Sequence, residues 1–326
     1  MDSRQRDIIR AAGKAQKKTD KAIHTCLVPG CSQHAIASHS QHRAGQLKAI
    51  AHENEVYAVE KNLYKALKKK RPIGSAPFTK TPIKKASTFP GFCSTHDNII
   101  FKPIERTKLE CGNEQQSVLL FLRAHAFEYL QKQRAYIWNS YFLREAQSLL
   151  SRESLGNYHL RMEGINYFLT SDAPYYFKRI FEAITKNEYG GIESAWVEIP
   201  KNILVSVSCC MSPLMHRHIG YMVEHQQSAQ PAVSFSVVPN QDSTHIAVSW
   251  LKEHSELSSW LKESLDNPEE LEQIINQCIF GESEDTCISP TLWESLSAAE
   301  QSLIAQAAGF TRELEIPAPV PRVVKL

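Results

Sequence analysis

The spacing of apolar positions predicts a long helix over residues 113–143. Apolar and aromatic side chains recur there at intervals of three, four and seven residues, which is the repeat of one face of an α-helix. These side chains are Val118, Phe121, Leu122, His125, Tyr129 and Tyr136. Residues 1–22 show a weaker form of the repeat. Their thin apolar stripe predicts a basic helix or arm that does not fold alone.

Helical and strand patterns alternate farther along the chain. A second helical stretch covers residues 152–186 and is interrupted near "TSDAPYYF", where Asp172 is a candidate cap and Pro174 suits a first helical turn. Alternating, β-branched residues predict one or two strands at 194–211 and a hairpin at 232–251. Further helices are predicted at 256–264, 268–279 and 290–308. The pattern indicates a mainly helical α+β body with a few antiparallel strands.

Turn-forming residues distinguish the front of the chain from this body. The stretches "VPG", "RPIG", "APF", "TPI" and "FPGF" punctuate residues 23–110, which contain few long apolar runs. A bound metal would help such a segment to fold. We therefore expect four parts: a basic N-terminal helix or arm at 1–22, a zinc-binding module at 23–110, an acidic α+β domain at 111–316 and a proline-rich tail at 317–326.

Charge also divides the chain near residue 110. Residues 1–110 contain 21 Lys and Arg against 9 Asp and Glu, a net charge of +12, whereas the remainder has a net charge of −10. The cations gather at 14–21 and in "KALKKKRP" at 65–72. Clustered cations attract a polyanion without reading its sequence, so nucleic acid is the expected partner of residues 1–110. A solvated charge run is the alternative. The acidic domain is a candidate surface for a protein partner.

The sequence predicts neither a secretory signal peptide nor a membrane-spanning helix. It has no run of eighteen apolar residues, and its beginning, "MDSRQRDIIRAAGKAQKK", lacks the apolar stretch and cleavage site of a signal peptide. We therefore expect a cytoplasmic protein that does not enter a membrane. Because the cytoplasm is reducing, the eight cysteines are interpreted as metal ligands or buried apolar residues rather than as a disulfide framework.

Two closely spaced pairs of residues predict a zinc site. Cys26 and Cys31 flank the turn-forming "LVPG", and Cys93 and His96 lie three positions apart in "FPGFCSTHDN". Structural zinc takes four nitrogen or sulfur ligands in a tetrahedron, often supplied as two such pairs. The four residues therefore predict a Cys3His site that closes a treble-clef-like fold.

Two alternatives to this ligand set remain open. The spacing C-x4-C-x7-H-x2-H would use His39 and His42 as the second pair. The cysteines could also be small apolar residues of the core, without a metal. The remaining cysteines lack a paired motif and are expected in the core or at incidental positions: Cys111, Cys209, Cys210, Cys278 and Cys287.

The order of these motifs resembles the HNH, or ββα-metal, nucleases over residues 26–101. The first zinc pair is followed by "AIASH", which ends at His39, then by a second strand and by "FCSTHDN". The resemblance implies that His39 is the general base and that Ser38 and Asp97 take the positions that hold a catalytic Mg²⁺ or Mn²⁺. Ser38 stands where the family has an acidic or imidazole ligand. The motifs also resemble those of uncharacterised bacterial proteins with CxxxxC, SH and FPGFCxxHD, from which no activity carries over.

Three functions are compatible with these features. The first is a metal-dependent nuclease acting on DNA or RNA, as in a bacterial antiviral defence or toxin effector, with His39 and Asp97 as its catalytic residues. The second is a non-catalytic zinc module that binds nucleic acid or a protein within a complex. The third is a structural subunit whose basic arm meets an acidic partner. In the last two, His39 would cap a turn or replace His96 on the zinc.

Overall fold

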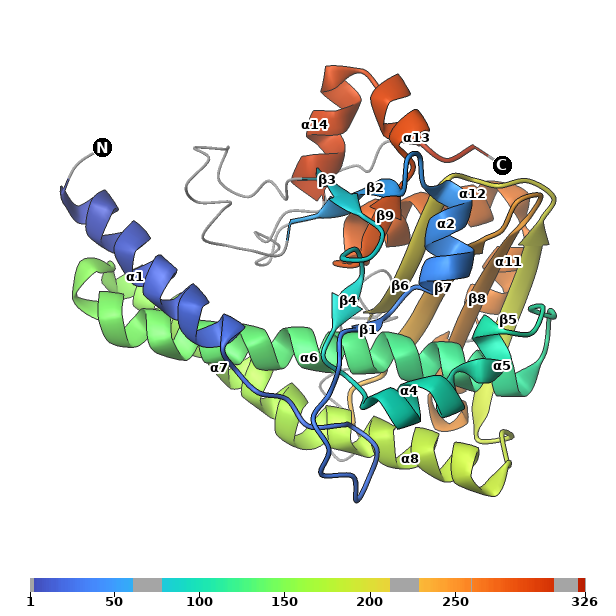
Figure 1. The fold of residues 1–326 in the computed structure, drawn as a ribbon, viewed down its shortest axis with the longest axis horizontal. Helices are drawn as coiled ribbons and strands as arrows, with labels where there is room; N and C mark the ends of the chain where they lie inside the picture. The colour runs from blue at the N-terminus through green and yellow to red at the C-terminus, as the bar shows by residue number, and fades with distance from the viewer. Residues whose placement is uncertain (1–2, 61–77, 212–228, 259, 308–321, 326) are drawn as a thin grey trace.

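A seven-stranded antiparallel sheet and the long helix α6 (Glu114–Ala146) organise the protein (Figure 1). The computed structural model describes residues 3–60, 78–211, 229–258, 260–307 and 322–325. The basic block "KALKKKRP" lies outside the described residues, so its contact with nucleic acid stays a prediction. The antiparallel pairing and the helices around the sheet make this an α+β fold, which confirms the predicted class.

The sheet takes strands from both sides of residue 110. Its order is β3-β2-β9-β6-β7-β8-β5. The bounds are β2 Glu55–Val59, β3 Phe78–Pro82, β5 Ile192–Ile199, β6 Val205–Met211, β7 Val233–Pro239, β8 Thr244–Leu251 and β9 Thr286–Ile288. The strands predicted at 194–211 and the hairpin predicted at 232–251 correspond to β5 to β8, which are neighbours in the order β6-β7-β8-β5. Strand β9 pairs with both β2 and β6, so the predicted front module and the predicted acidic domain share one sheet.

Helices surround this sheet and the segment beside it. Their bounds are α1 Ser3–Asp20, α2 Lys48–Ile50, α4 Ser94–Ile100, α5 Lys102–Glu105, α7 Arg152–Tyr167, α8 Ala173–Lys186, α10 Ser255–Ser258, α11 Trp260–Asp266, α12 Pro268–Asn276, α13 Pro290–Ser295 and α14 Ala298–Ala307. Asn113 is the N-cap of helix α6, and its side chain accepts a hydrogen bond from the N–H of Gln116. This cap satisfies one of the free amides at the helix start. The predicted long helix is thereby confirmed.

The central strands are buried on both faces. Every residue of β7 and β8 is buried. Large side chains such as Phe235, Val248 and Trp250 belong to a core that also contains residues of α11 and α12. On the opposite face, which lies toward α6, several positions are small, such as Ser234, Ser236 and Ala247. Small side chains there allow the helix to pack closely on the sheet.

The basic N-terminal helix packs against the second half of α6. Ala11, Ala12 and Ala15 form a small core with aromatic residues of α6, including Trp138 and Phe142. Lys14 and Glu145 form an ion pair of 2.6 Å across this contact, and Arg134 and Asp20 form another of 3.1 Å. The thin apolar stripe of α1 is therefore covered by a neighbouring helix, while its basic side chains remain exposed.

The predicted interruption within residues 152–186 is a π-helical segment, Phe168–Asp172, which joins α7 to α8 without a break in the helical path. The predicted cap at Asp172 is wrong. Its backbone is helical, and its carboxylate accepts a hydrogen bond of 3.2 Å from the N–H of Gln230 instead of an amide of α8. Because the π turn keeps the chain helical, α8 has no free N-terminus at which Asp172 could act.

The described end of the predicted tail, residues 322–325, packs on the body. The amide of Asn276 accepts hydrogen bonds from the N–H groups of Val323 and Val324 and donates one to the carbonyl of Val324.

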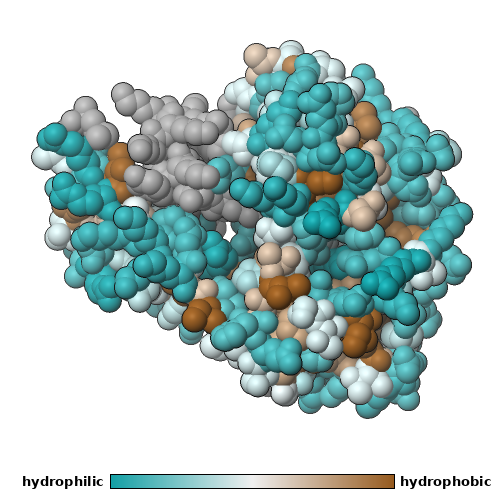
Figure 2. Space-filling model, viewed as in Figure 1, coloured by the Kyte–Doolittle hydropathy of each residue, from teal (hydrophilic) through white to brown (hydrophobic). Residues whose placement is uncertain are grey.

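On the face in Figure 2, hydrophobic side chains of the described residues are scattered among hydrophilic ones. Among the helices that the structure describes, none combines the length and the apolar character needed to cross a bilayer.

Candidate metal centre and adjoining site

The four predicted zinc ligands meet between the turn after α1 and the start of α4. Their ligand atoms all lie within 4.8 Å of one another. Nδ1 of His96 is 3.4 Å from Sγ of Cys26 and 3.4 Å from Sγ of Cys93. The structure thus joins two pairs that lie far apart in the sequence.

Local backbone structure presents each pair. The turn that carries Cys26 and Cys31 is closed by Gly30, whose φ of +78° lies in the left-handed region that favours glycine. Cys93 occupies the N-cap position of α4, and His96 follows one turn later on the same face. The nearby backbone N–H of His96 lowers the pKa of the Cys93 thiol. A helix start therefore favours the thiolate that zinc requires.

These distances fit a tetrahedral zinc ion. Zn–S and Zn–N bonds of about 2.3 and 2.0 Å with tetrahedral angles give a sulfur–nitrogen edge of about 3.5 Å. Both measured edges are 3.4 Å. Burial raises the pKa of Cys26 to about 11, so its thiolate needs a compensating positive charge. The cluster could therefore hold a metal ion such as zinc.

The alternative pair of ligands is not gathered at this cluster. Among the described residues, the group around Cys26 and Cys31 contains Cys93 and His96, and neither His39 nor His42. Nδ1 of His39 is instead 3.0 Å from the carbonyl oxygen of Ala86. The geometry favours the Cys3His set over the C-x4-C-x7-H-x2-H set.

Beside this cluster, two short strands and a helix hold the other predicted site residues. Strand β1 (Ser38–His39) pairs antiparallel with β4 (Thr88–Phe89), in the register Ser38↔Phe89 and His39↔Thr88. Helix α4, which carries Asp97, begins shortly after β4. The segment between β1 and β4 contains β2 and β3, which belong to the large sheet. The strand–strand–helix unit is therefore assembled across a long insertion.

The surroundings of His39 favour the neutral form of its ring. Burial lowers its pKa, a change that its hydrogen bond to Ala86 opposes. The ring is therefore neutral at pH 7. A neutral ring donates its Nδ1–H to the Ala86 carbonyl and keeps a lone pair on Nε2. This arrangement also fits a purely structural histidine, since the same bond ties β1 to the chain before β4.

Ser38 and Asp97 present unsatisfied oxygen atoms. Oγ of Ser38 and Oδ1 of Asp97 are both buried without a hydrogen bond of good geometry. Burial raises the pKa of Asp97, and the nearby hydroxyl of Ser38 opposes this rise. Buried polar atoms without partners are rare in proteins, and a bound ion or water is one explanation. Oxygen ligands of this kind suit Mg²⁺.

A buried arginine accompanies His39 and Asp97. Arg123 of α6 is only 2% exposed, donates to Glu105 over 2.5 Å and stacks 4.0 Å from the ring centre of Phe101. Its positive charge lowers the pKa of both His39 and Asp97. Its Nε is buried without an acceptor. Sequence reasoning missed this residue, although one arginine within the apolar run "SVLLFLRAHAF" is a visible signal.

No protein-family model, curated protein or solved structure matched this chain. The interpretation of the site therefore depends on the geometry and chemistry of its own residues.

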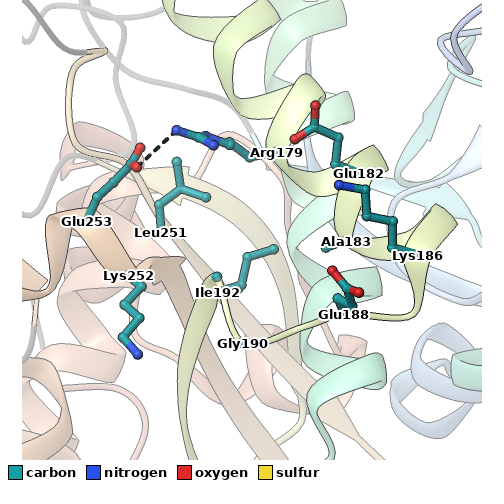
Figure 3. Close-up of a pocket in the computed structure, with 11 residues that line it drawn as sticks. Arg179, Glu182, Ala183, Lys186, Glu188, Gly190, Ile192, Leu251, Lys252 and Glu253 are labelled. Atoms are coloured by element: carbon teal, nitrogen blue, oxygen red, sulfur yellow. Dashed lines mark hydrogen bonds and ion pairs between the residues drawn. The ribbon is translucent and has the colours of Figure 1, made fainter.

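A separate cavity of about 680 Å³ lies between α8 and the adjacent ends of β5 and β8 (Figure 3). Charges of both signs surround it, including Lys186 and Glu188, and Arg179 pairs with Glu253 at 3.4 Å. None of the predicted site residues lines this cavity. Its mixed charges do not indicate a particular ligand.

Proposed function

We propose that residues 26–101 form a zinc-stabilised, treble-clef module of the HNH type that hydrolyses phosphodiester bonds in nucleic acid. The observation that supports this most strongly is the order β1–β4–α4 beside the Cys3His cluster, with His39 on the first strand and Asp97 directly after a zinc ligand. In this proposal the zinc does not contact substrate. It holds the turn at Cys26 against α4, and so orients the unit that carries the reactive groups.

The proposed reaction assigns a distinct task to each residue. Nε2 of His39 accepts a proton from a water molecule as that water attacks phosphorus, and the P–O bond to the 3′ oxygen breaks. Asp97, with the hydroxyl of Ser38 beside it, would hold Mg²⁺ or Mn²⁺. Such an ion supplies charge stabilisation to the departing oxygen. Water and a phosphodiester are thereby converted into a phosphomonoester and an alcohol.

Arg123 supports the protonation states that this reaction needs. A general base must be unprotonated, and a carboxylate must be ionised to bind a divalent cation. The guanidinium of Arg123 favours both conditions, because it lowers the pKa of His39 and that of Asp97. Arg123 is therefore assigned a positioning and electrostatic role, not a catalytic one.

The excess of positive charge in residues 1–110 supports a polyanionic substrate.

One observation favours a second candidate function, a zinc module that binds nucleic acid or a protein partner without cleaving anything. Ser38 offers a neutral hydroxyl where the HNH family has a stronger metal ligand. With fewer ionic ligands, the catalytic cation would bind less tightly.

Cleavage assays test the proposal. Supercoiled plasmid and single-stranded RNA are incubated with the wild type, His39→Ala and His34→Ala, with and without Mg²⁺ or Mn²⁺. His34 is an exposed histidine of the same segment and serves as the matched control. We expect metal-dependent cleavage by the wild type and His34→Ala, and a rate at least about 100-fold lower for His39→Ala. Equal cleavage by His39→Ala would remove His39 from the mechanism. Binding that weakens steeply with salt, without cleavage, would support the second function.

A further inference from the structure

A second group of metal-binding side chains lies where α6 begins. Cys111 precedes the helix, Glu198 is on β5 and His245 is on β8. One ligand atom from each lies within 4.8 Å of the other two. None of these residues belongs to the Cys3His cluster or to the strand–strand–helix unit. Their proximity arises only in the folded chain.

The backbone fixes all three positions. Glu198 and His245 are directly opposite in the antiparallel β5–β8 register, so their side chains emerge on the same face. Cys111 is held by a turn at Gly112, with a φ of +78°, immediately before the capped start of α6. The ring of Trp196 packs edge-on against His245, with centroids 6.1 Å apart. Two strands, a helix start and an aromatic ring therefore hold the group together.

One ring nitrogen of His245 lacks the hydrogen bond that its burial requires. The residue is 2% exposed, and its Nε2 is buried without a hydrogen-bond partner. The nearest carboxylate oxygen, on Glu198, is 3.8 Å away, which is too far for a hydrogen bond. On the other side of the ring, Nδ1 and Sγ of Cys111 form a long hydrogen bond of 3.7 Å. A buried nitrogen without a partner is costly, and a ligand at this point would relieve it.

We propose that Cys111, Glu198 and His245 form a second metal site, selective for Zn²⁺ and related divalent transition metals. Thiolate, imidazole and carboxylate are the donors that zinc accepts, whereas a sulfur ligand disfavours Mg²⁺ and Ca²⁺. Three protein ligands leave a fourth position for water. Cys111 is exposed and the Glu198 side chain is 46% exposed, so both can rotate toward an ion near the fixed ring of His245. The ion ties the loop before α6 to β5 and β8.

The site binds zinc more weakly than the Cys3His cluster does. It has one thiolate instead of three, and Lys108 lies near enough for its charge to act on His245. Repulsion between this lysine and a cation reduces affinity. The two sites can therefore be filled one after the other in a titration, and each can be removed without the other.

The test uses the full chain, stripped with a chelator and titrated with Zn²⁺. Bound zinc per chain is compared for the wild type, Cys111→Ser, Glu198→Gln and the control Glu188→Gln, which changes a carboxylate outside the group. We expect Cys111→Ser and Glu198→Gln each to bind one equivalent fewer than the wild type, and Glu188→Gln to bind the same number. Wild-type stoichiometry in Cys111→Ser would overturn the proposal.

A second readout does not depend on counting ions. Of the eight cysteines, all of which lie within the described residues, only Cys111 is exposed. Its alkylation by iodoacetamide, located by peptide mass spectrometry, should slow at least tenfold when Zn²⁺ is added to the wild type. The slowing should be lost in Glu198→Gln and kept in Glu188→Gln. An alkylation rate that zinc leaves unchanged in the wild type would contradict the site.

Discussion

Nδ1 of His96 lies 3.4 Å from Sγ of Cys26, although 70 residues separate them in the chain. Cys26 and Cys93 also belong to the apolar core that contains Phe127 of α6. A metal ion at this point would therefore join the N-terminal turn to α4 and hold both against the central helix.

The first prediction concerns the metal cluster. Cys93→Ser should lose one equivalent of zinc and several kcal/mol of unfolding free energy, because the binding energy of a structural zinc contributes directly to folding. Metal analysis and thermal denaturation measure these effects. His34→Ala, which changes an exposed histidine outside both groups of metal-binding side chains, is the control and should keep the zinc content and the stability of the wild type. Full retention of cluster zinc by Cys93→Ser would contradict the predicted ligands.

The second prediction concerns the proposed catalytic cation. Asp97→Asn keeps the size of the side chain but removes its charge, so cleavage should require at least about tenfold more Mg²⁺ for half-maximal rate. The exposed turn residue Asp242 supplies the matched control, since Asp242→Asn should leave the requirement unchanged. Identical Mg²⁺ dependence of wild type and Asp97→Asn would exclude Asp97 as a ligand.

The third prediction concerns the buried arginine. Arg123→Met should lower the unfolding free energy by about 3 kcal/mol, because Glu105 loses its partner in a poorly hydrated site. The positive charge of Arg123 lowers the pKa of His39, so the loss of that charge raises the pKa of His39. The acid limb of the cleavage–pH profile should therefore move to higher pH. Arg123→Lys, which retains a charge, should leave the limb near its wild-type position. A profile that does not move in Arg123→Met would show that the arginine has no electrostatic influence on His39.

The fourth prediction concerns acid stability. His125 is fully buried among aromatic rings. Burial lowers its pKa to about 4, whereas the pKa of a solvent-exposed histidine is 6.5. Between pH 6.5 and 4 the unfolded chain binds a proton there and the folded chain does not. Stability is therefore fully present above pH 6.5 and falls as the pH decreases, by about 3 kcal/mol at pH 4.

His125→Phe removes this titration and preserves an aromatic ring. Urea denaturation at several pH values should give a shallower fall in stability for the variant between pH 6.5 and 4. The comparison uses the slope, so a uniform loss of stability from altered packing does not affect it. Equal slopes for the two proteins would contradict the assignment to His125.

The sequence predicted those elements whose signal is local. The long helix and the β7–β8 hairpin have repeating apolar positions within one continuous segment, so their periodicity identifies them. Strands β2 and β9 are short, and they pair with each other across more than half of the chain. No local pattern specifies such a partner. The sequence therefore predicts a separate loop-rich module at the front of the chain, whereas in the structure this segment contributes β2 and β3 to the main sheet.

The same distinction applies to the candidate sites. Each zinc pair is recognisable from its own spacing, and the need for four ligands suggests that the pairs combine. The contact of His39 with Ala86, 47 residues away, has no counterpart in the sequence pattern. Cys111 likewise has no partner ligand nearby in the sequence. The other two residues of its group, Glu198 and His245, come together only because β5 and β8 pair in this register. Groups assembled from distant elements become visible only in the fold.

The central claim is that an ion at Cys26, Cys31, Cys93 and His96 ties the N-terminal turn to α4. X-ray absorption at the zinc edge, recorded on the Cys111→Ser variant so that one site dominates, tests it most directly. We predict three sulfur neighbours at about 2.3 Å and one nitrogen at about 2.0 Å. A shell made only of oxygen and nitrogen, or a purified protein without zinc that also fails to bind it when added, would contradict this claim.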